Sequence, residues 1–239
     1  MLAETNQGYR NSGVAMLVSL HCLEEATVVD TGNAKDTIAS FRSMKGSVEA
    51  LRHSADAAVL LVASMGPRAC GIAYVNSVKS GNTVSVATKA CALGYFTFGH
   101  ELAHNMGAQH NREAGAVNLA HPWGHGHLIA GGGESSGQRT IMAYSSPGHT
   151  RRVNYYSNPW VVLPQTGTPT GKLLANNAAV LSTARAALAR LGDQAVCCAC
   201  QRPVHSLQEK PKPFPFITGI VADVAAKVHD LFSKINPFG

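Results

Sequence analysis

Apolar runs and helix-like patterns alternate along the first part of the chain. Residues 2–12 have the pattern of a helix that stops at Gly13, and residues 14–23 are rich in Val and Leu, which is typical of a strand. Residues 36–53 repeat apolar side chains at helical spacing, and residues 57–63 form a continuous apolar run that suits a strand buried on both faces. This alternation predicts a sheet covered by helices, in the α/β or α+β class.

The next segment predicts a hairpin followed by a helix. Residues 70–75 and 83–88 are short strand-like runs, and the turn-forming sequence Lys-Ser-Gly-Asn lies between them at 79–82. We therefore expect an antiparallel pair of strands here. Residues 95–106 then have the pattern of a helix that ends at Gly107.

The remainder of the chain changes character twice. Residues 111–140 are rich in Gly and His and lack periodicity, and a long irregular loop of this kind in a compact domain is usually functional. Residues 176–191 have the pattern of a helix with one apolar face. Cys and Pro cluster in residues 193–216, which predicts a linker, and apolar side chains then recur at helical spacing in residues 217–239. We expect an appended amphipathic helix there.

The linker and the appended helix leave several interpretations open. Cys197, Cys198 and Cys200 are interpreted as a disulfide tether or as inert thiols, since no partner motif for a metal follows them. The polar face of the helix carries both Asp and Lys, which favours packing on the domain over binding to a membrane surface.

The composition is that of a globular chain with a large core. Of 239 residues, 45% are hydrophobic and 14% are charged, and the formal net charge is +6. The basic residues are scattered, with Arg151-Arg152 as the densest pair, which argues against nucleic-acid binding. No stretch is long enough to span a membrane, and residues 1–6 lack the pattern of a signal peptide. The sequence does not indicate an oligomeric state.

One segment carries a dense pattern of metal-binding chemistry, H-E-x-x-H-x-x-G-x-x-H, which begins at His100. His100 and His104 are four residues apart and share one face of a helix, so both imidazoles can point at one Zn²⁺. Glu101 can reach a water molecule on that ion, and Gly107 permits a turn that returns His110 as the third ligand. Three protein ligands leave one position open, as catalytic zinc sites do.

Two further features lie outside this motif. The sequence Thr-Ile-Met-Ala-Tyr-Ser at 140–145 matches the Met-turn expected after such a motif, with Met142 as a soft base beneath the ligands. Cys70 and Cys91 flank the predicted hairpin and could form a disulfide, which would imply an oxidising compartment. Two buried free thiols are the alternative.

Together these motifs resemble the metzincin superfamily of zinc endopeptidases, and the reprolysin-like (adamalysin-like) branch in particular. The resemblance extends over residues 1–192 and implies a metzincin-like zincin fold. That fold has a twisted, mostly parallel sheet with one antiparallel edge strand, here 70–75, an active-site helix and a small irregular C-terminal subdomain. The segments similar to that branch are Asn-Met-Gly-Ala at 105–108, Ala-Cys-Gly-Ile-Ala-Tyr at 69–74, Tyr-Tyr-Ser-Asn-Pro at 155–159 and the start at 6–13.

The chain departs from the pattern of this branch at three places. Asn111 follows the third His where Asp is common, and Ala103 replaces a common Gly in the helix. The central strand that precedes the first helix in the family is not found, so we expect a catalytic domain over residues 1–192 that lacks its first strand. A gap in mid-sheet would leave backbone groups of two neighbouring strands unpaired, as in an incomplete or degenerate copy.

The resemblance also bears on two sets of residues near the motif. Tyr144 follows Met142 by two positions, as does a tyrosine of astacin-like enzymes that can steady the oxyanion, but packing near the site is the favoured interpretation because reprolysins do without it. His121, His125 and His127 could form a second metal site, yet the corresponding stretch in similar proteins is aromatic and Gly-rich, so we interpret them as loop-wall residues.

The sequence thus predicts a zinc-dependent metalloendopeptidase with one catalytic Zn²⁺. His100, His104 and His110 would hold the metal, and Glu101 would act as general base on a metal-activated water. The partners would be protein or peptide substrates, with no nucleic acid and no membrane span, and the resemblance implies a secreted, extracellular protein. The alternative is an inactive or truncated metzincin-like module that binds zinc or a partner. A structural zinc protein is disfavoured, since structural sites are usually four-coordinate.

Overall fold

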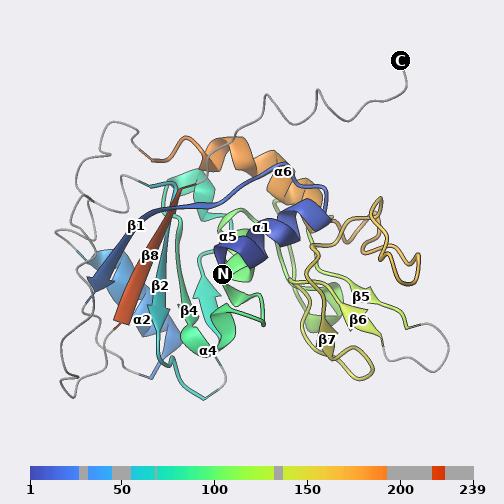
Figure 1. Ribbon diagram of the computed structural model, residues 1–239, viewed down its shortest axis with the longest axis horizontal. Coiled ribbons are helices and arrows are strands. Elements are labelled where there is room, and N and C mark those ends of the chain that lie inside the picture. The colour runs from blue at the N-terminus through green and yellow to red at the C-terminus, as the bar shows by residue number, and fades with distance from the viewer. Residues whose placement is uncertain (27–31, 45–54, 68, 132–136, 193–216, 224–239) are drawn as a thin grey trace.

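The structure is a computed structural model that describes residues 1–26, 32–44, 55–67, 69–131, 137–192 and 217–223. Its main feature is a five-stranded sheet with the strand order β1-β8-β2-β4-β3. A three-stranded sheet with the order β5-β6-β7 lies on the opposite side of the molecule, with helix α5 between the two (Figure 1). The architecture therefore agrees with the expected mixed α/β class and the metzincin-like arrangement.

The elements follow one another in the order that the sequence pattern predicts up to the last helix. The large sheet consists of β1 (Ser19–Ala26), β2 (Ala57–Val62), β3 (Gly71–Ala73), β4 (Val84–Thr88) and β8 (Ile217–Asp223). The small sheet consists of β5 (Leu128–Ile129), β6 (Gln138–Arg139) and β7 (Arg151–Arg152). The helices are α1 (Leu2–Asn11), α2 (Ala34–Ser43), α4 (Lys89–Ala92), α5 (Thr97–Asn105) and α6 (Asn177–Leu188), with short 3₁₀ turns η1 (Ser77–Ser80) and η2 (Arg112–Ala114).

Strand β2 separates two hydrophobic clusters, which explains its continuous apolar sequence. Val59 and Leu61 point into a cluster shared with α1, α5 and α6, whereas Leu60 and Val62 point into a cluster shared with α2 and β4. Every residue of β2 is buried. A strand covered by helices on both faces needs apolar side chains at successive positions, as predicted.

The edge strand β3 pairs antiparallel with β4, as the hairpin pattern predicted. Strands β2 and β4 are parallel, and β1 runs in the same direction as β2 because both are antiparallel to β8. The first strand begins later than expected, at Ser19. The backbone of Val18 bonds instead to the side chain of Asn6, with both distances at 2.8 Å, so the preceding residues are held by α1 rather than by a strand.

The prediction of a C-terminal amphipathic helix over residues 217–239 was wrong for its first seven residues, which form β8. Residues 224–239 and the predicted linker at 193–216 lie outside the described residues. Ile217, Thr218, Ile220 and Val221 are β-branched, which favours a strand, and a short apolar run is ambiguous by periodicity alone. The helical spacing was therefore not decisive.

Strand β8 also changes the expectation of an open gap in the sheet. It lies between β1 and β2 and is antiparallel to both, with Ile220 opposite Leu23 on one side and Val59 on the other (Figure 1). The position where a missing central strand would leave backbone groups unpaired is thus filled by a segment from the far end of the chain. The sheet consequently has a second antiparallel strand besides β3.

Candidate active site

Helix α5 places the first part of the site in the centre of the molecule. His100, Glu101 and His104 all lie on this helix and are buried. The helix ends in a Schellman motif, in which Gly107 donates to the carbonyl of His104 at 2.9 Å and Ala108 donates to that of Ala103 at 2.9 Å. Gly107 has a φ of +101°, a conformation that other residues resist, so the chain leaves the helix as the motif predicted.

The turn after α5 brings His110 back over the helix. Gln109 donates its backbone N–H to Gly124 and accepts one from Gly126, both at 2.9 Å, which fixes the returning segment against the irregular loop. The Nδ1 atom of His125 lies 2.9 Å from the carbonyl oxygen of His110. His125 therefore orients the backbone of the third histidine and is not itself part of the site.

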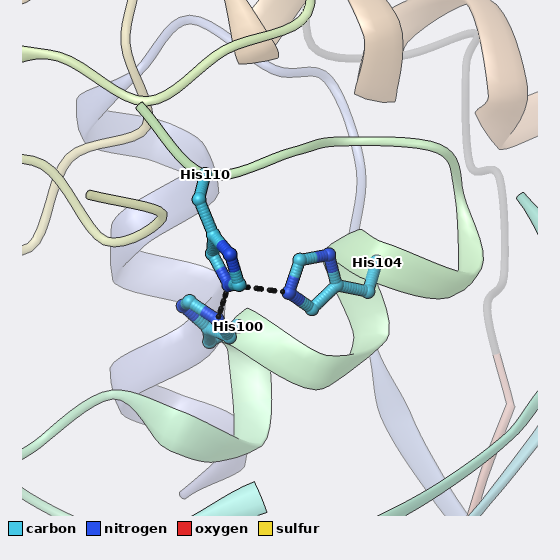
Figure 2. Close-up of side chains that lie close together, drawn as sticks. All are labelled: His100, His104 and His110. Carbon is cyan, nitrogen blue, oxygen red and sulfur yellow. Dashed lines mark hydrogen bonds between the residues drawn. The ribbon is translucent and has the colours of Figure 1, made fainter. Parts of the chain in front are cut away.

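The three histidine rings converge on one point (Figure 2). The Nε2 atom of His110 lies 3.2 Å from that of His100 and 2.9 Å from that of His104. Ring atom Nδ1 of His100 lies 2.8 Å from the Ile141 carbonyl, and Nδ1 of His104 lies 2.8 Å from the Ala108 carbonyl. A carbonyl can only accept, so each Nδ1 carries the proton and each Nε2 presents a lone pair.

This arrangement fits a tetrahedral metal ion. Three nitrogens at the zinc distance of about 2.0–2.1 Å from a tetrahedral ion lie about 3.3 Å from one another. The observed separations are close to this value, and lone pairs that face each other repel unless a cation lies between them. Among the described residues, His100, His104 and His110 are the group of three or more His, Cys, Asp or Glu side chains placed to share an ion, and His121 and His127 lie outside this group.

Burial keeps these rings neutral. The pKa of His104 is lowered to about 4, and that of His110 to about 3, chiefly because both rings are removed from water. The pKa of His100 is also lowered well below its usual range, first by burial and then by the neighbouring His104 and Arg152. Neutral imidazole is the form that binds a metal ion, so the site is prepared to bind one throughout the neutral pH range.

Glu101 lies beside the histidines in an apolar setting. Its side chain is 4% exposed, and burial raises the pKa of its carboxyl group to about 8, an effect that the positive charge of Arg152 partly offsets. A cation held by the histidines would lower that pKa further, because an opposite charge favours the carboxylate. A carboxyl group tuned in this way suits proton transfer near neutral pH.

These shifts have opposite consequences for the stability of the metal-free protein. The unfolded chain binds protons on His104 between pH 6.5 and about 4 that the folded chain does not, so stability falls as the pH falls through this range. Folded Glu101 instead binds a proton between its ordinary value of 4.5 and about 8, which opposes the effect. In a Glu101→Gln variant treated with chelator, the free energy of unfolding should fall by about 3 kcal/mol or more between about pH 7 and pH 4.

The check is urea unfolding at several pH values. Wild-type protein in the same chelator, in which Glu101 opposes the histidines, should show a smaller decline than Glu101→Gln. Equal declines in the two proteins would contradict the burial of the carboxyl group. A flat profile for Glu101→Gln would contradict the depressed histidine pKa values.

Gly71, at the start of edge strand β3, makes room for Glu101. A Cβ atom at this position would collide with the Oε1, Cδ and Cγ atoms of Glu101. The sequence pattern at 69–74 indicated only a strand and the family resemblance. The close approach of Glu101 to Gly71 could not be predicted from the spacing of apolar residues. The edge strand thus lies directly against the carboxylate.

A methyl group at this position tests that contact. Gly71→Ala should displace the Glu101 side chain and lower turnover about 100-fold, because a misplaced catalytic group loses its alignment with the substrate. Metal content should stay at the wild-type level, since the three atoms nearest to the added methyl group all belong to Glu101 and none to a histidine. Ala73→Ser, two residues along the same strand, serves as a control that should keep most activity. Unchanged turnover of Gly71→Ala would contradict the tight placement.

The Met-turn contacts the first histidine of the site. Met142 is fully buried, the N–H of Ala143 donates to the Thr140 carbonyl at 3.0 Å, and the Ile141 carbonyl receives the His100 ring proton. Gly126 packs so closely here that a Cβ atom would lie 2.7 Å from the backbone of Met142 and Ala143. The turn therefore fixes the orientation of the first ligand.

Asn111 ties the third ligand to this turn. Its Oδ1 atom accepts a hydrogen bond of 2.9 Å from the backbone N–H of Tyr144, and its Nδ2 donates to Glu113 at 3.1 Å. The amide thus performs a hydrogen-bonding role at the position where Asp is common. The Tyr144 ring packs on His110 with 3.8 Å between centroids, and the side chain is 48% exposed.

Two arginines lie close to the site, and their positions in the sequence did not predict this location. Arg139 on β6 and Arg152 on β7 occupy neighbouring positions in the small sheet. The charge of Arg152 lowers the pKa of Glu101, His100 and His110, so this residue contributes to the electrostatics of the site. The pair Arg151-Arg152 was visible in the sequence as the densest basic pair, but the spatial relation to Glu101 depends on the fold.

Cys70 and Cys91 form a disulfide, which confirms one of the two interpretations of this pair. The bond links the residue before β3 to helix α4 just after β4, and the N–H of Thr88 donates to the Cys70 carbonyl at 2.8 Å. The disulfide therefore anchors the edge strand that lies against Glu101. In the described part of the chain, no helix combines the length and apolar character required to cross a membrane.

Several known proteins are similar to this chain in sequence, and a solved structure is similar in fold. Peptidyl-Asp metalloendopeptidases of Stenotrophomonas maltophilia strain K279a and of Xanthomonas campestris are 33% and 30% identical, each over 79% of this chain but only 46% and 45% of the relative. The chain thus spans about half the length of these curated relatives. A peptidyl-Asp metalloendopeptidase of Pseudomonas fragi is 27% identical over 76% of this chain and its own full length.

A solved structure described as a chaperone-substrate complex shares the fold. It superposes with a TM-score of 0.56 at 20% identity, over 78% of this chain and 30% of the other. Residues 1–157 match the sequence profile described as metallo-peptidase family M12. The match includes the histidine motif, Glu101 and the Met-turn, and the chain therefore belongs to metallo-peptidase family M12.

Proposed function

We propose that this protein is a zinc-dependent endopeptidase that hydrolyses peptide bonds with Glu101 as general base. The observation that supports this most directly is the convergence of three Nε2 lone pairs beside a buried carboxylate. A binding-only site has no need of that carboxylate. Zinc is the metal proposed because three neutral imidazole ligands with one open position are typical of catalytic zinc sites.

Each residue of the site has a separate proposed role. His100, His104 and His110 would hold the zinc ion, which supplies a Lewis acid that polarises a carbonyl group and lowers the pKa of water. Glu101 accepts a proton from the attacking water and later donates it to the leaving amine, since its carboxyl pKa lies near neutrality. Gly71 keeps the carboxylate within reach of a peptide bound along the edge strand.

The edge strand supports peptide binding. Strand β3 is the last strand of the large sheet and pairs only with β4 in the described part of the chain. An extended peptide that pairs with this free edge would satisfy the backbone groups of β3 and would pass next to Glu101. Strand addition of this kind recognises the peptide through main-chain hydrogen bonds, which do not depend on the amino-acid sequence of the peptide. A preference among substrates therefore has to come from side-chain contacts.

The names of the relatives indicate the preferred substrate. The three bacterial relatives are named peptidyl-Asp metalloendopeptidases. We infer that this protein likewise cleaves next to Asp residues, and that it acts outside the cytoplasm, where the Cys70–Cys91 disulfide would persist.

A direct assay tests the proposed activity. The purified full chain with zinc should cleave denatured casein, cleavage should stop with chelator, and bound zinc should be one ion per chain. The fragments, identified by mass spectrometry, should share an Asp beside the cut. One zinc ion per chain without cleavage would instead support the alternative of an inactive zinc-binding module.

A role for Tyr144 in stabilising the oxyanion is a separate proposal. Its ring packs on His110 and the side chain is half exposed, so the hydroxyl group could approach a bound substrate. Tyr144→Phe keeps the ring and removes only the hydroxyl group. Turnover should fall at least about 10-fold if the hydroxyl group stabilises the oxyanion, whereas unchanged turnover would leave only the packing role.

A further inference from the structure

The two arginines in the small sheet have different surroundings. Arg139 is buried and donates to the carbonyls of Ala143 at 2.7 Å and Thr150 at 3.2 Å, so its guanidinium group holds the Met-turn to the strand that follows. Arg152 lies opposite it in register on β7. Like charges directly opposite each other on neighbouring strands are destabilising, and an anion bound nearby would offset their repulsion.

Arg152 has unused hydrogen-bonding capacity. Its Nη1 donates to the Tyr95 carbonyl at 2.7 Å, and the central carbon of the guanidinium group lies 5.8 Å from the centroid of the Tyr95 ring. Its Nε atom is buried and has no partner. No ion pair joins Arg152 to an Asp or Glu side chain within the described ranges, so a buried donor is left without an acceptor. Such a donor costs free energy unless a ligand supplies the acceptor.

The position of Arg152 defines what the ligand could be. Arg139, its neighbour in register, donates to the Ala143 carbonyl of the Met-turn, and the Ile141 carbonyl of that turn lies 2.8 Å from Nδ1 of His100. Arg152 therefore lies on the strand next to the site, and its charge lowers the pKa of Glu101. A guanidinium group with a free edge matches a carboxylate, which accepts two parallel hydrogen bonds. An acidic side chain of the substrate, close to the scissile bond, would satisfy Nε and offset the repulsion from Arg139.

We propose that Arg152 is the specificity-determining residue of this site and binds the side-chain carboxylate of the substrate residue next to the scissile bond. The inference rests on the proposed peptidase function for its substrate, but carboxylate binding does not require Glu101 or turnover. The competing explanation is that Arg152 only tunes Glu101 through its charge. That role would affect all substrates equally, whereas recognition affects acidic ones.

Binding without turnover provides the first test. The zinc-loaded Glu101→Gln protein is titrated with two blocked peptides that are identical except for a central Asp or Asn, and affinity is followed by fluorescence anisotropy. The Asp peptide should bind about 100-fold more tightly, and adding Arg152→Gln should make the two affinities about equal. Arg151→Gln, the same charge change at the exposed neighbouring residue, should preserve the preference. Equal affinities with Arg152 present would overturn the proposal, as would a preference that survives its removal.

Cleavage of the same peptides by protein with intact Glu101 separates recognition from tuning. Arg152→Gln should lower kcat/KM for the Asp peptide about 100-fold and change it little for the Asn peptide. Arg152→Lys should restore only part of the preference, since an ammonium group lacks the fork geometry. Equal losses of kcat/KM for both peptides would overturn the proposal that Arg152 binds the substrate carboxylate, and would indicate that it acts through the pKa of Glu101. A protein that binds Asp selectively but cleaves neither peptide would refute the peptidase function and leave the assignment of Arg152 intact.

Discussion

Glu101→Gln should lower kcat/KM for a peptide substrate about 10²- to 10⁴-fold while bound zinc stays at one ion per chain. The amide has the size of the carboxyl group and cannot accept a proton from water. Glu101 is not among the groups that converge on the metal position, which comprise His100, His104 and His110. Turnover is measured with a fluorogenic peptide, and zinc by elemental analysis of the same sample.

The stability of this variant makes the result interpretable. Burial raises the pKa of Glu101 to about 8, so the ionised group destabilises the metal-free fold, and a neutral amide removes that cost. Metal-free Glu101→Gln should therefore unfold at a temperature no lower than that of wild type. Glu25→Gln, an exposed position on β1, is the matched control and should keep full activity. Substantial turnover by Glu101→Gln would exclude Glu101 as the base.

The convergence of the three histidines could be predicted because the motif that carries them is local. His100, Glu101, His104 and His110 lie within eleven consecutive positions, and one helical turn plus a glycine-dependent exit determines their relative placement. Met142 could be predicted because it completes a spaced motif. The helix α5 and the fully buried strand β2 were also predicted, since each has a pattern that fits a single secondary structure.

Contacts between distant segments could not be predicted in this way. Gly71 has a special role only because the fold places β3 against Glu101, 30 positions further along the sequence, at a distance that leaves no room for a methyl group. Arg152 lies close enough for its charge to affect Glu101 because β7 pairs with β6, whose Arg139 bonds to the Met-turn. The neighbours of a single glycine or arginine cannot be predicted from its type and its position in the sequence.

Strand β8 shows the same limit at the level of the fold. The segment 217–223 has β-branched residues but also fits a helical spacing, and only the free edges of β1 and β2 decide between the two. A backbone that lies between two strands can satisfy its N–H and C=O groups on both sides. Pairing with β1 and β2 therefore outweighs the weak helical preference of this segment.

The position of β8 links the end of the chain to the catalytic helix. Leu60 of β2, which lies opposite Gly219, is fully buried, and Val59 and Leu61 pack in the same hydrophobic cluster as Leu102 of α5. Loss of β8 would leave backbone groups of both β1 and β2 without partners in the middle of the sheet, at about 1–3 kcal/mol for each buried group. A shifted β2 would then disturb the support of the helix that carries the histidines.

Ile220→Pro should therefore destabilise the whole domain by about 3 kcal/mol or more, because proline removes the N–H from a strand with neighbours on both sides. Ile220→Val, which keeps the backbone donor and the β-branched side chain, should cost less than about 1.5 kcal/mol. A chain ending at residue 192 should lose cooperative unfolding and zinc binding, and an added peptide with the sequence of residues 217–223 should restore part of both. If the shortened chain unfolded with the midpoint of the full chain, β8 would contribute nothing to the sheet, and the domain would be stable with β1 and β2 unpaired at their facing edges.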